Sequence, residues 1–378
     1  MTLCVTTRIG GLPILVSDFL VTSTGTISSF ESPLFPEIGR VAHRPDGSKV
    51  IGFARKTLLV HKDLLISAAG SLESISSVFS RLSILYGQFA PASLQNLVRG
   101  LAILSESQSL SCEIVGWLVV GSEAVGFRWN SSNPDSIASG DDHVIGSGQR
   151  LFEDLKLPHE QIKLDAARRI EGAFSAVLRD VGTLVVNELI YGNTLSEAFG
   201  GGYEIFCHTA EGFEQLDNVA YLIFSIKLLP DDTIRVGRVP ILVNSIVIGE
   251  EIICRTVIPK NWIGVPSDEK ERIAIARKLV SGQAILDIPA KSLPLSAKRY
   301  VVACVGSAVN GENEVYTAVV CGEEAQQFKI YLTGVAKDEK EEIRFELPQH
   351  IMLNIIQQAF LSFSRQTSAD ILSKVNDR

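Results

Sequence analysis

Two short apolar runs open the chain, and a pair of glycines separates them. Residues 2–9 (TLCVTTRI) and 12–17 (LPILVS) are typical of β-strands, and Gly10-Gly11 between them is typical of a hairpin turn. Residues 23–49 are instead rich in serine, proline and glycine, which predicts a loop. The chain is therefore expected to begin with a β-hairpin followed by a long connection.

Beyond this loop, strand-like and helix-like patterns alternate up to about residue 217. Apolar residues recur at helical spacing over 72–86 and 94–104, and 163–192 contains a long apolar helix. A further helix is predicted just after residue 148. Strands are predicted at 57–60, 64–67, 112–128 (a hairpin) and 203–208. This order favours two sheets with helices stacked outside them, a layered αββα arrangement within an α+β protein.

The pattern then restarts in the remainder of the chain. A charged helix is predicted at 267–281, where Ser267 is a suitable N-cap, and an amphipathic helix at 349–376. Strands are predicted at 219–227, 233–237, 240–247, 251–257, 300–308, 314–322 and 327–334. We therefore predict two domains, residues 1–217 and residues 218–378, the second an independently folded α+β domain of unknown role.

Composition and charge narrow the class of protein. The 378 residues are 46% hydrophobic, enough for two cores, and the net charge is −8 with a pI of about 5.4. Because no stretch is rich in Lys and Arg, nucleic acid is an unfavoured partner. A signal peptide and a transmembrane run are both missing from the sequence pattern, which predicts a cytoplasmic protein that does not use a membrane. The six cysteines lack CxxC spacing and the six histidines are dispersed, so we expect neither a metal nor another cofactor.

Residues near the start carry chemistry when they are taken together. Removal of Met1 would leave Thr2 with a nucleophilic hydroxyl and a basic α-amine in one residue. Such an amine titrates at roughly 7.7–8.0, so a useful fraction is neutral near pH 7. Asp18 ends the second predicted strand sixteen residues after Thr2, and Lys56 precedes Gly70 by fourteen residues across a strand–turn–strand segment.

A Gly-Ser-Gly at 146–148, between an aspartate-rich loop and a predicted helix, completes the set. With these motifs, residues 2–217 resemble the N-terminal threonine hydrolases of the proteasome β-subunit family. They are most similar to the bacterial proteasome-like, ancestral β-subunit group, whose members also begin Met-Thr-x-Cys-Val. The resemblance implies a four-layer αββα N-terminal-nucleophile (Ntn) hydrolase sandwich with the second domain appended to it.

The resemblance also implies a role for each matched residue. Thr2 would be the nucleophile of an acyl-enzyme, and Asp18 and Lys56 an ion pair beside it. Gly70 would supply the oxyanion-hole N–H, and Ser147 would hydrogen-bond the terminal amine. The family places its lysine about sixteen residues after the aspartate, where this chain has a leucine. We therefore predict an insertion over about 26–48, which a surface loop tolerates because closure entropy grows only with the logarithm of length.

Substrate binding follows from the same resemblance. The backbone of Thr22 would bind an unfolded peptide as an added strand, and Ala68 and Leu72 would line a pocket for an apolar side chain. The family motif Asp-x-x-Ser-Gly-Gly before the last strand is altered here, since Glu197 stands in place of the Asp and Gly200 in place of the Ser.

The resemblance further implies a self-compartmentalised homo-oligomeric ring, and it makes an ATP-dependent unfoldase a candidate partner. Two other functions remain open from the sequence. One is a catalytically inactive proteasome-like scaffold or interaction protein, and the other is a small-molecule amidase on the same fold.

Overall fold

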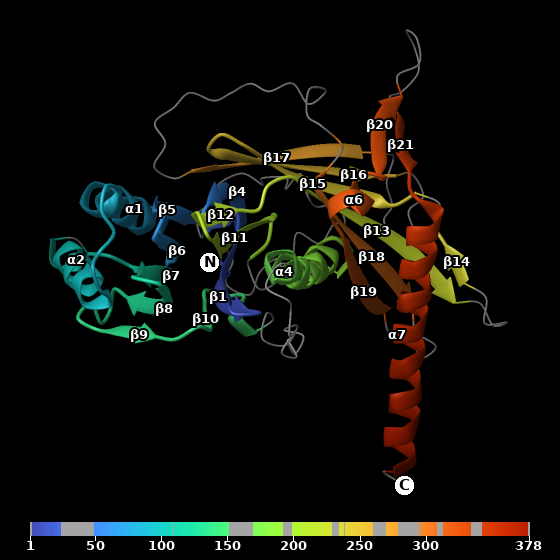
Figure 1. The fold of residues 1–378 in the computed structure, drawn as a ribbon, viewed down its shortest axis with the longest axis horizontal. Coiled ribbons are helices and arrows are strands. Elements are labelled where there is room, and N and C mark those ends of the chain that lie inside the picture. Colours follow the sequence, from blue (N-terminus) through green and yellow to red (C-terminus); the bar gives the residue numbers. More distant parts are fainter. Residues whose placement is uncertain are drawn as a thin grey trace.

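The computed structural model describes most of the chain, and over that part the protein is mixed α+β with strands predominating (Figure 1). The described residues are 2–23, 49–107, 109–150, 169–191, 199–228, 234–237, 239–259, 270–278, 295, 297–307, 313–333 and 342–376. None of the helices in these ranges has the length and apolar character needed to span a bilayer.

A five-stranded antiparallel sheet, here called the first sheet, carries the start of the chain in the order β10-β1-β2-β11-β12. Its strands are β1 (Cys4–Ile9), β2 (Leu12–Asp18), β10 (His143–Ile145), β11 (Tyr203–Thr209) and β12 (Gly212–Gln215). The predicted hairpin is confirmed, because Cys4 lies opposite Ser17 and Ile9 opposite Leu12. Both turn glycines have a positive φ, 57° and 84°, which glycine adopts without strain.

A second five-stranded antiparallel sheet follows the order β5-β6-β7-β8-β9 and is covered by two helices. Its elements are β5 (Thr57–His61), β6 (Leu64–Gly70), β7 (Cys112–Val120), β8 (Glu123–Asn130), β9 (Ile137–Ser139), α1 (Leu72–Tyr86) and α2 (Leu94–Ser107). Ser71 caps α1 by accepting a hydrogen bond from the Ser74 N–H at 3.1 Å. The predicted strands, hairpin and helices of this region are confirmed.

The two sheets face each other across a layer of apolar side chains. Leu15 and Phe206 of the first sheet contact Leu65 and Trp117 of the second in one buried cluster. The indole N–H of Trp117 donates to the Ile14 carbonyl oxygen at 2.9 Å, so the ring is fixed by both packing and a hydrogen bond. The second sheet therefore has helices on one face and the first sheet on the other.

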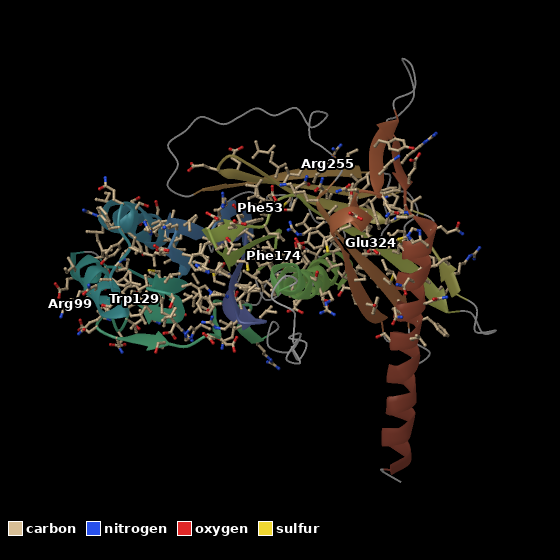
Figure 2. The ribbon with its side chains drawn as sticks, in the orientation of Figure 1. Phe53, Arg99, Trp129, Phe174, Arg255 and Glu324 are labelled. Atoms are coloured by element: carbon tan, nitrogen blue, oxygen red, sulfur yellow. The ribbon has the colours of Figure 1, made fainter. Side chains whose placement is uncertain are left out.

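The opposite face of the first sheet is covered by helix α4 (Arg169–Val186), which continues into a π-helical turn (Asn187–Tyr191). The same cluster contains residues of a third, larger sheet, so α4 lies between two sheets. Figure 2 shows Phe174 of α4 in this layer. A Cβ at Gly182 would lie 2.7 Å from Val301 of the large sheet, which indicates how closely the helix approaches it.

The large sheet has nine strands and joins both halves of the chain. Its order is β19-β18-β13-β15-β16-β17-β4-β3, with β14 paired to β13. The strands are β3 (Leu20–Ser23), β4 (Lys49–Arg55), β13 (Val219–Leu228), β14 (Ile234–Val236), β15 (Ile241–Ile248), β16 (Glu251–Ile258), β17 (Lys270–Lys278), β18 (Arg299–Ser307) and β19 (Asn313–Val320). Strands β4 and β17 pair in parallel, with Arg277 opposite Ala54 and Lys278 opposite Arg55. The sheet thus crosses the predicted domain boundary at residue 217.

The far face of the large sheet is covered by C-terminal elements (Figure 1). These are α6 (Gly322–Ala325), the two-stranded pair β20 (Lys329–Thr333) and β21 (Glu342–Glu346), and α7 (Gln349–Asn376). Ile351, Ile355 and Ala359 of α7 are buried there, at the i, i+4, i+8 spacing of one helix face. The predicted helix over 349–376 is confirmed.

The predicted helix at 267–281 is wrong, because its described residues form strand β17. Seven consecutive residues of β17 pair with β16 in an antiparallel ladder. Isoleucine at alternate positions 273 and 275 is the β-branched pattern of a strand, and the flanking charges obscured it in the sequence. Strand β4 was also missed, since its glycine interrupts a short run. Ser267, the predicted insertion over 26–48 and most of the helix expected after residue 148 lie outside the described residues.

Candidate active site

The carboxylate of Asp18 is the centre of a buried cluster at the end of β2. Its Oδ1 accepts hydrogen bonds from the Thr2 hydroxyl at 2.5 Å, the Leu3 N–H at 2.9 Å and the Lys56 Nζ at 2.7 Å. Thr2, Asp18 and Lys56 are 1%, 0% and 2% exposed. The structure therefore brings together three residues that lie 16 and 38 positions apart in the chain. A hydroxyl and an ammonium group share one carboxylate oxygen.

The second carboxylate oxygen and the lysine are held by backbone groups. Oδ2 of Asp18 accepts from the Gly200 N–H at 2.8 Å and from the Leu20 N–H at 3.2 Å. The Lys56 Nζ also donates to the Leu20 carbonyl oxygen at 2.6 Å. Because the opposite charges are adjacent and both are hydrogen-bonded, the buried ion pair is compensated.

Two backbone contacts place the Gly-Ser-Gly motif directly against Thr2. The Gly148 N–H donates to the Thr2 carbonyl oxygen at 3.3 Å. A Cβ at Gly146, whose φ is +92°, would lie 2.0 Å from the same oxygen, so only glycine fits there. Between them, the Ser147 hydroxyl is buried and has no hydrogen-bond partner among the described residues. It is the kind of group that an added ligand or a freed amine would satisfy.

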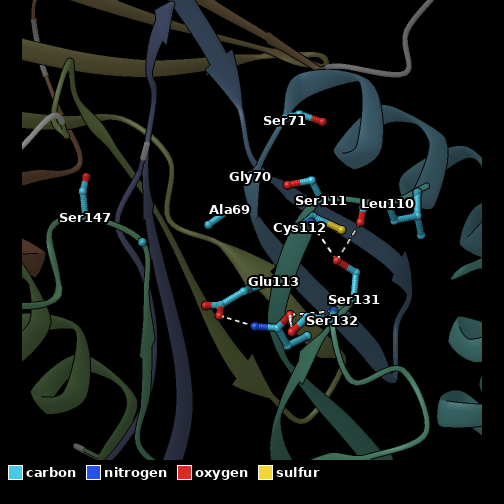
Figure 3. Close-up of a pocket in the computed structure, with 12 residues that line it drawn as sticks. Ala69, Gly70, Ser71, Leu110, Ser111, Cys112, Glu113, Ser131, Ser132 and Ser147 are labelled. Carbon is cyan, nitrogen blue, oxygen red and sulfur yellow. Dashed lines mark hydrogen bonds between the residues drawn. The ribbon is translucent and has the colours of Figure 1, made fainter. Parts of the chain in front are cut away.

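A cavity of about 520 Å³ adjoins this motif (Figure 3). It is lined by residues 69–71, 110–113, 130–132, 146 and 147. Gly70 lies on its wall at the end of β6, with φ +139°, and a Cβ there would lie 2.3 Å from the Ser111 carbonyl oxygen. The cavity therefore extends from the proposed oxyanion-hole residue to the residues that contact Thr2.

Several polar side chains stand on the wall of this cavity. Figure 3 shows Glu113 on this wall, and the Asn130 Nδ2 donates to its carboxylate at 2.5 Å. Arg128, on the neighbouring strand, forms an ion pair with the same carboxylate at 3.2 Å. The sulfur of Cys112 also lies on this wall, and burial followed by the Glu113 charge raises the pKa of its thiol to about 11. The thiol therefore stays protonated near neutral pH.

The residues predicted to bind substrate are not brought to this cavity. Ala68 is fully buried in the cluster beneath α1 and α2, and Leu72 is 37% exposed at the start of α1. Neither is part of the cavity lining, whereas the neighbouring Ala69 is. Thr22 lies on β3, opposite Val50 of β4, and in the described part of the sheet β3 pairs only with β4. An apolar substrate pocket at Ala68 and Leu72 stays a prediction.

The altered glycine-rich motif has a physical explanation at Gly200. Its φ is +124°, and a Cβ would lie 2.1 Å from a carboxylate oxygen of Glu188 on the π-helical turn. The Gly201 N–H donates to the other Glu188 oxygen at 2.8 Å. The backbone N–H of Gly200 donates the hydrogen bond to Asp18, so no side chain is needed at this position to bond that carboxylate. Glu197 lies outside the described residues.

Cys4, two residues after Thr2, carries a thiol that is unreactive near neutral pH. Burial raises the pKa of its thiol to about 12, although the Ser67 hydrogen bond and the Lys56 charge oppose the shift. The thiolate is the reactive form of cysteine, so this thiol is inert near neutral pH. Across the described ranges, His, Cys, Asp and Glu side chains form no group of three or more that could hold a metal ion.

Sequence alone missed the backbone partners of the cluster. The N–H groups of Leu3 and Gly200 and the carbonyl of Leu20 bond Asp18 or Lys56, and backbone groups leave no signal in residue identity. Comparison of the chain with models of protein families and with curated proteins found no match.

Proposed function

We propose that the chain is an N-terminal threonine peptidase of the proteasome-like Ntn-hydrolase class. The observation that carries the proposal is the convergence of the Thr2 hydroxyl and the Lys56 ammonium on one buried oxygen of Asp18. The packing order of α1 and α2, the second sheet, the first sheet and α4 supports assigning these layers to an αββα sandwich.

The chemistry begins with removal of Met1, which frees the Thr2 α-amine. The amine takes the hydroxyl proton as the Thr2 oxygen attacks the carbonyl carbon of the substrate peptide bond. Lys56 lowers the cost of the negative charge that develops on this oxygen, and the adjacent Asp18 carboxylate compensates the buried lysine charge. The Gly70 N–H stabilises the oxyanion, and losing one such donor typically costs on the order of 10²–10³ in rate.

Collapse of the tetrahedral intermediate breaks the C–N bond, and the leaving amine takes the proton from the α-amine. The product is an ester between the acyl group and the Thr2 oxygen, which water then hydrolyses. The buried, unpartnered Ser147 hydroxyl is well suited to hold the α-amine during both steps.

Substrate would be an unfolded peptide that pairs with the open edge of β3 near Thr22. A homo-oligomeric ring would enclose the site, and an ATP-dependent unfoldase would feed it. Among the strands that the structure describes, β3 stands at the edge of the large sheet, which supports strand addition.

The second candidate function is an inactive proteasome-like scaffold. It is favoured by the burial of Thr2, which is 1% exposed and has its hydroxyl committed to Asp18. In that case Met1 would be retained and the fold would serve assembly.

The deciding experiment is intact mass spectrometry after incubation with a peptide epoxyketone, which reacts with both the hydroxyl and the free amine of a terminal threonine. The peptidase predicts loss of Met1 and one adduct per chain, with no adduct in Thr2→Ala. A chain that retains Met1, or loses it and takes no adduct, would contradict the peptidase and favour the scaffold.

A further inference from the structure

A second buried carboxylate, Glu204 on β11, lies close to the first. It is 1% exposed and accepts three hydrogen bonds from protein groups. Its Oε2 bonds the Arg55 Nε at 3.1 Å, and its Oε1 bonds the Thr57 N–H and the Ser17 hydroxyl, each at 3.0 Å. A carboxylate with these partners is fixed in position.

All three partners are chain neighbours of the candidate catalytic pair. Ser17 precedes Asp18, and Arg55 and Thr57 stand on either side of Lys56, which is the single residue between β4 and β5. In extended chain, successive side chains point to opposite sides. Glu204 therefore connects the end of β2 to the β4–β5 junction, on the side opposite to the Asp18 and Lys56 side chains.

Arg55 extends this clamp into the C-terminal half of the chain. Its Nη1 donates to the Glu250 carbonyl oxygen, in the turn between β15 and β16, at 2.9 Å. Its Nη2 donates to the Gln215 side chain at 2.8 Å. Arg55 is 6% exposed, so these bonds form away from water.

The C-terminal half also contacts the chain next to Asp18. Phe19, directly after Asp18, is buried in a cluster with Ile252 and Cys254 of β16 and with Phe53 of β4. Figure 2 shows Phe53 at this junction. The C-terminal half thus contacts the residue next to each member of the Asp18–Lys56 pair.

We propose that Glu204 is a positioning residue that holds Lys56 in register with Asp18 and Thr2, and that Arg55 makes the β15–β16 turn part of the same clamp. The proposal rests on the peptidase function proposed above. A misplacement of about 1 Å at a reacting group costs on the order of 10²-fold in rate. Removing the charge of Glu204 leaves the buried Arg55 guanidinium uncompensated, which forces such a shift at the adjacent Lys56.

The test is the full-length Glu204→Gln variant, which keeps the shape of the side chain and removes its charge. We expect kcat for a peptide substrate to fall about 100-fold, with KM changed less than about 3-fold, and epoxyketone addition to Thr2 to slow in parallel. Val302→Ala, in the core on the far face of the large sheet, is the control for lost stability and should keep the wild-type rate.

Two further variants separate the outcomes. Arg55→Lys keeps a charge opposite Glu204 but loses the bonds to the Glu250 carbonyl and Gln215, so we expect a loss of about 5-fold. If Glu204→Gln does not fold, Ser17→Ala removes one bond to Glu204 and should still lower kcat about 5- to 10-fold. A folded Glu204→Gln, or failing that Ser17→Ala, with wild-type kcat overturns the positioning role. A wild-type chain that takes no adduct overturns the peptidase function instead.

Discussion

Two buried ion pairs stand side by side in this molecule and differ in what surrounds them. Lys56 bonds Asp18, and its neighbour Arg55 bonds Glu204, with side chains 3% and 0% exposed in one pair and 8% and 0% in the other. Asp18 accepts the hydroxyl of Thr2, whereas Arg55 is engaged by three protein acceptors. Burial alone therefore does not distinguish the pair that we propose to be reactive from the pair that we propose to support it. The Thr2 hydroxyl on Asp18 does distinguish them.

A third pair, Glu113 with Arg128, provides the solvent-exposed reference. Its side chains are 28% and 38% exposed. The two residues lie on adjacent strands but are not directly opposite each other, since Arg128 pairs with Val115. Exposed pairs contribute about 0–1 kcal/mol, while breaking a buried pair costs about 3–5 kcal/mol. Variants of the three pairs should therefore separate effects on peptide turnover from effects on the free energy of unfolding.

The largest effect is expected for Lys56→Met. Removing the cation beside the nucleophile should lower peptide turnover by about 10³–10⁴-fold, the range seen when a charged member of a catalytic unit is lost. Turnover and epoxyketone addition measure it directly, with Lys62→Met on the β5–β6 turn as the control. Turnover within tenfold of wild type would contradict the reactive assignment of this pair.

Neutralising both members of each pair should separate the two roles. Arg55→Met alone should lower the free energy of unfolding by about 3–5 kcal/mol, and adding Glu204→Gln should restore most of it because no charge is left unpaired. Likewise, adding Asp18→Asn to Lys56→Met should restore most of the free energy of unfolding that Lys56→Met alone loses. Only the Arg55 and Glu204 double variant should regain turnover, to within about tenfold of wild type.

Denaturant unfolding and peptide turnover on the same samples measure both quantities. Equal loss of turnover in the two double variants would show that the pairs do not differ in role.

The buried Cys4 thiol predicts a smaller, pH-dependent effect. The Ser67 hydroxyl lies within hydrogen-bond distance of the Cys4 sulfur, at 3.0 Å, and of the Lys56 carbonyl oxygen, at 2.9 Å. Burial raises the pKa of the Cys4 thiol from 9.0 to about 12. The folded state therefore holds the thiol proton more tightly than the unfolded state does. The protonated thiol's contribution to the free energy of unfolding is complete below pH 9 and is lost as the pH rises towards 12. Between pH 9.5 and 11, wild type should lose about 1.4 kcal/mol per pH unit more than Cys4→Ala.

Urea midpoints at a series of pH values measure this slope. The other buried thiols contribute equally to both proteins, so the difference reports Cys4 alone. Parallel slopes for wild type and Cys4→Ala would contradict the predicted shift.

The smallest effect is expected for Glu113→Gln in the exposed pair. The free energy of unfolding should change by less than about 1 kcal/mol. Because this carboxylate lines the cavity beside Gly70 and Ser147, cleavage of peptides with a lysine near the cut bond should fall about 3- to 5-fold relative to glutamine peptides. Glu123→Gln, at the exposed start of β8, is the matched control, and an equal change in it would remove Glu113 from substrate selection.

Local patterns were enough to predict much of this molecule. The hairpin at Gly10-Gly11, helices α1 and α2 and the strands beside Lys56 follow from short-range periodicity and turn residues. The meeting of Thr2, Asp18 and Lys56 was predicted from the resemblance to the proteasome β-subunit family, whose spacings these residues match. The roles given to these residues stay predictions.

The rest depends on contacts that leave little local trace. β17 carries a dense charge pattern typical of a helix and becomes a strand through pairing with β16, a tertiary effect that overrides local preference. Arg55 and Glu204 are 149 residues apart. The signal for that pair was a carboxylate between Tyr203 and Ile205 in an apolar strand, since a buried strand does not hold an acid without a partner.

The parallel pairing of β4 with β17 has a consequence for biosynthesis. The strand that leads into Lys56 takes one of its two neighbours in the sheet, β17, from residues made more than two hundred positions later. Domains fold as the ribosome releases them, but contacts of such long sequence separation form slowly and only after both partners exist. The β4–β17 pairing that supports Lys56 therefore forms only after residue 278 has been made, and a shorter nascent chain carries Thr2, Asp18 and Lys56 without this support.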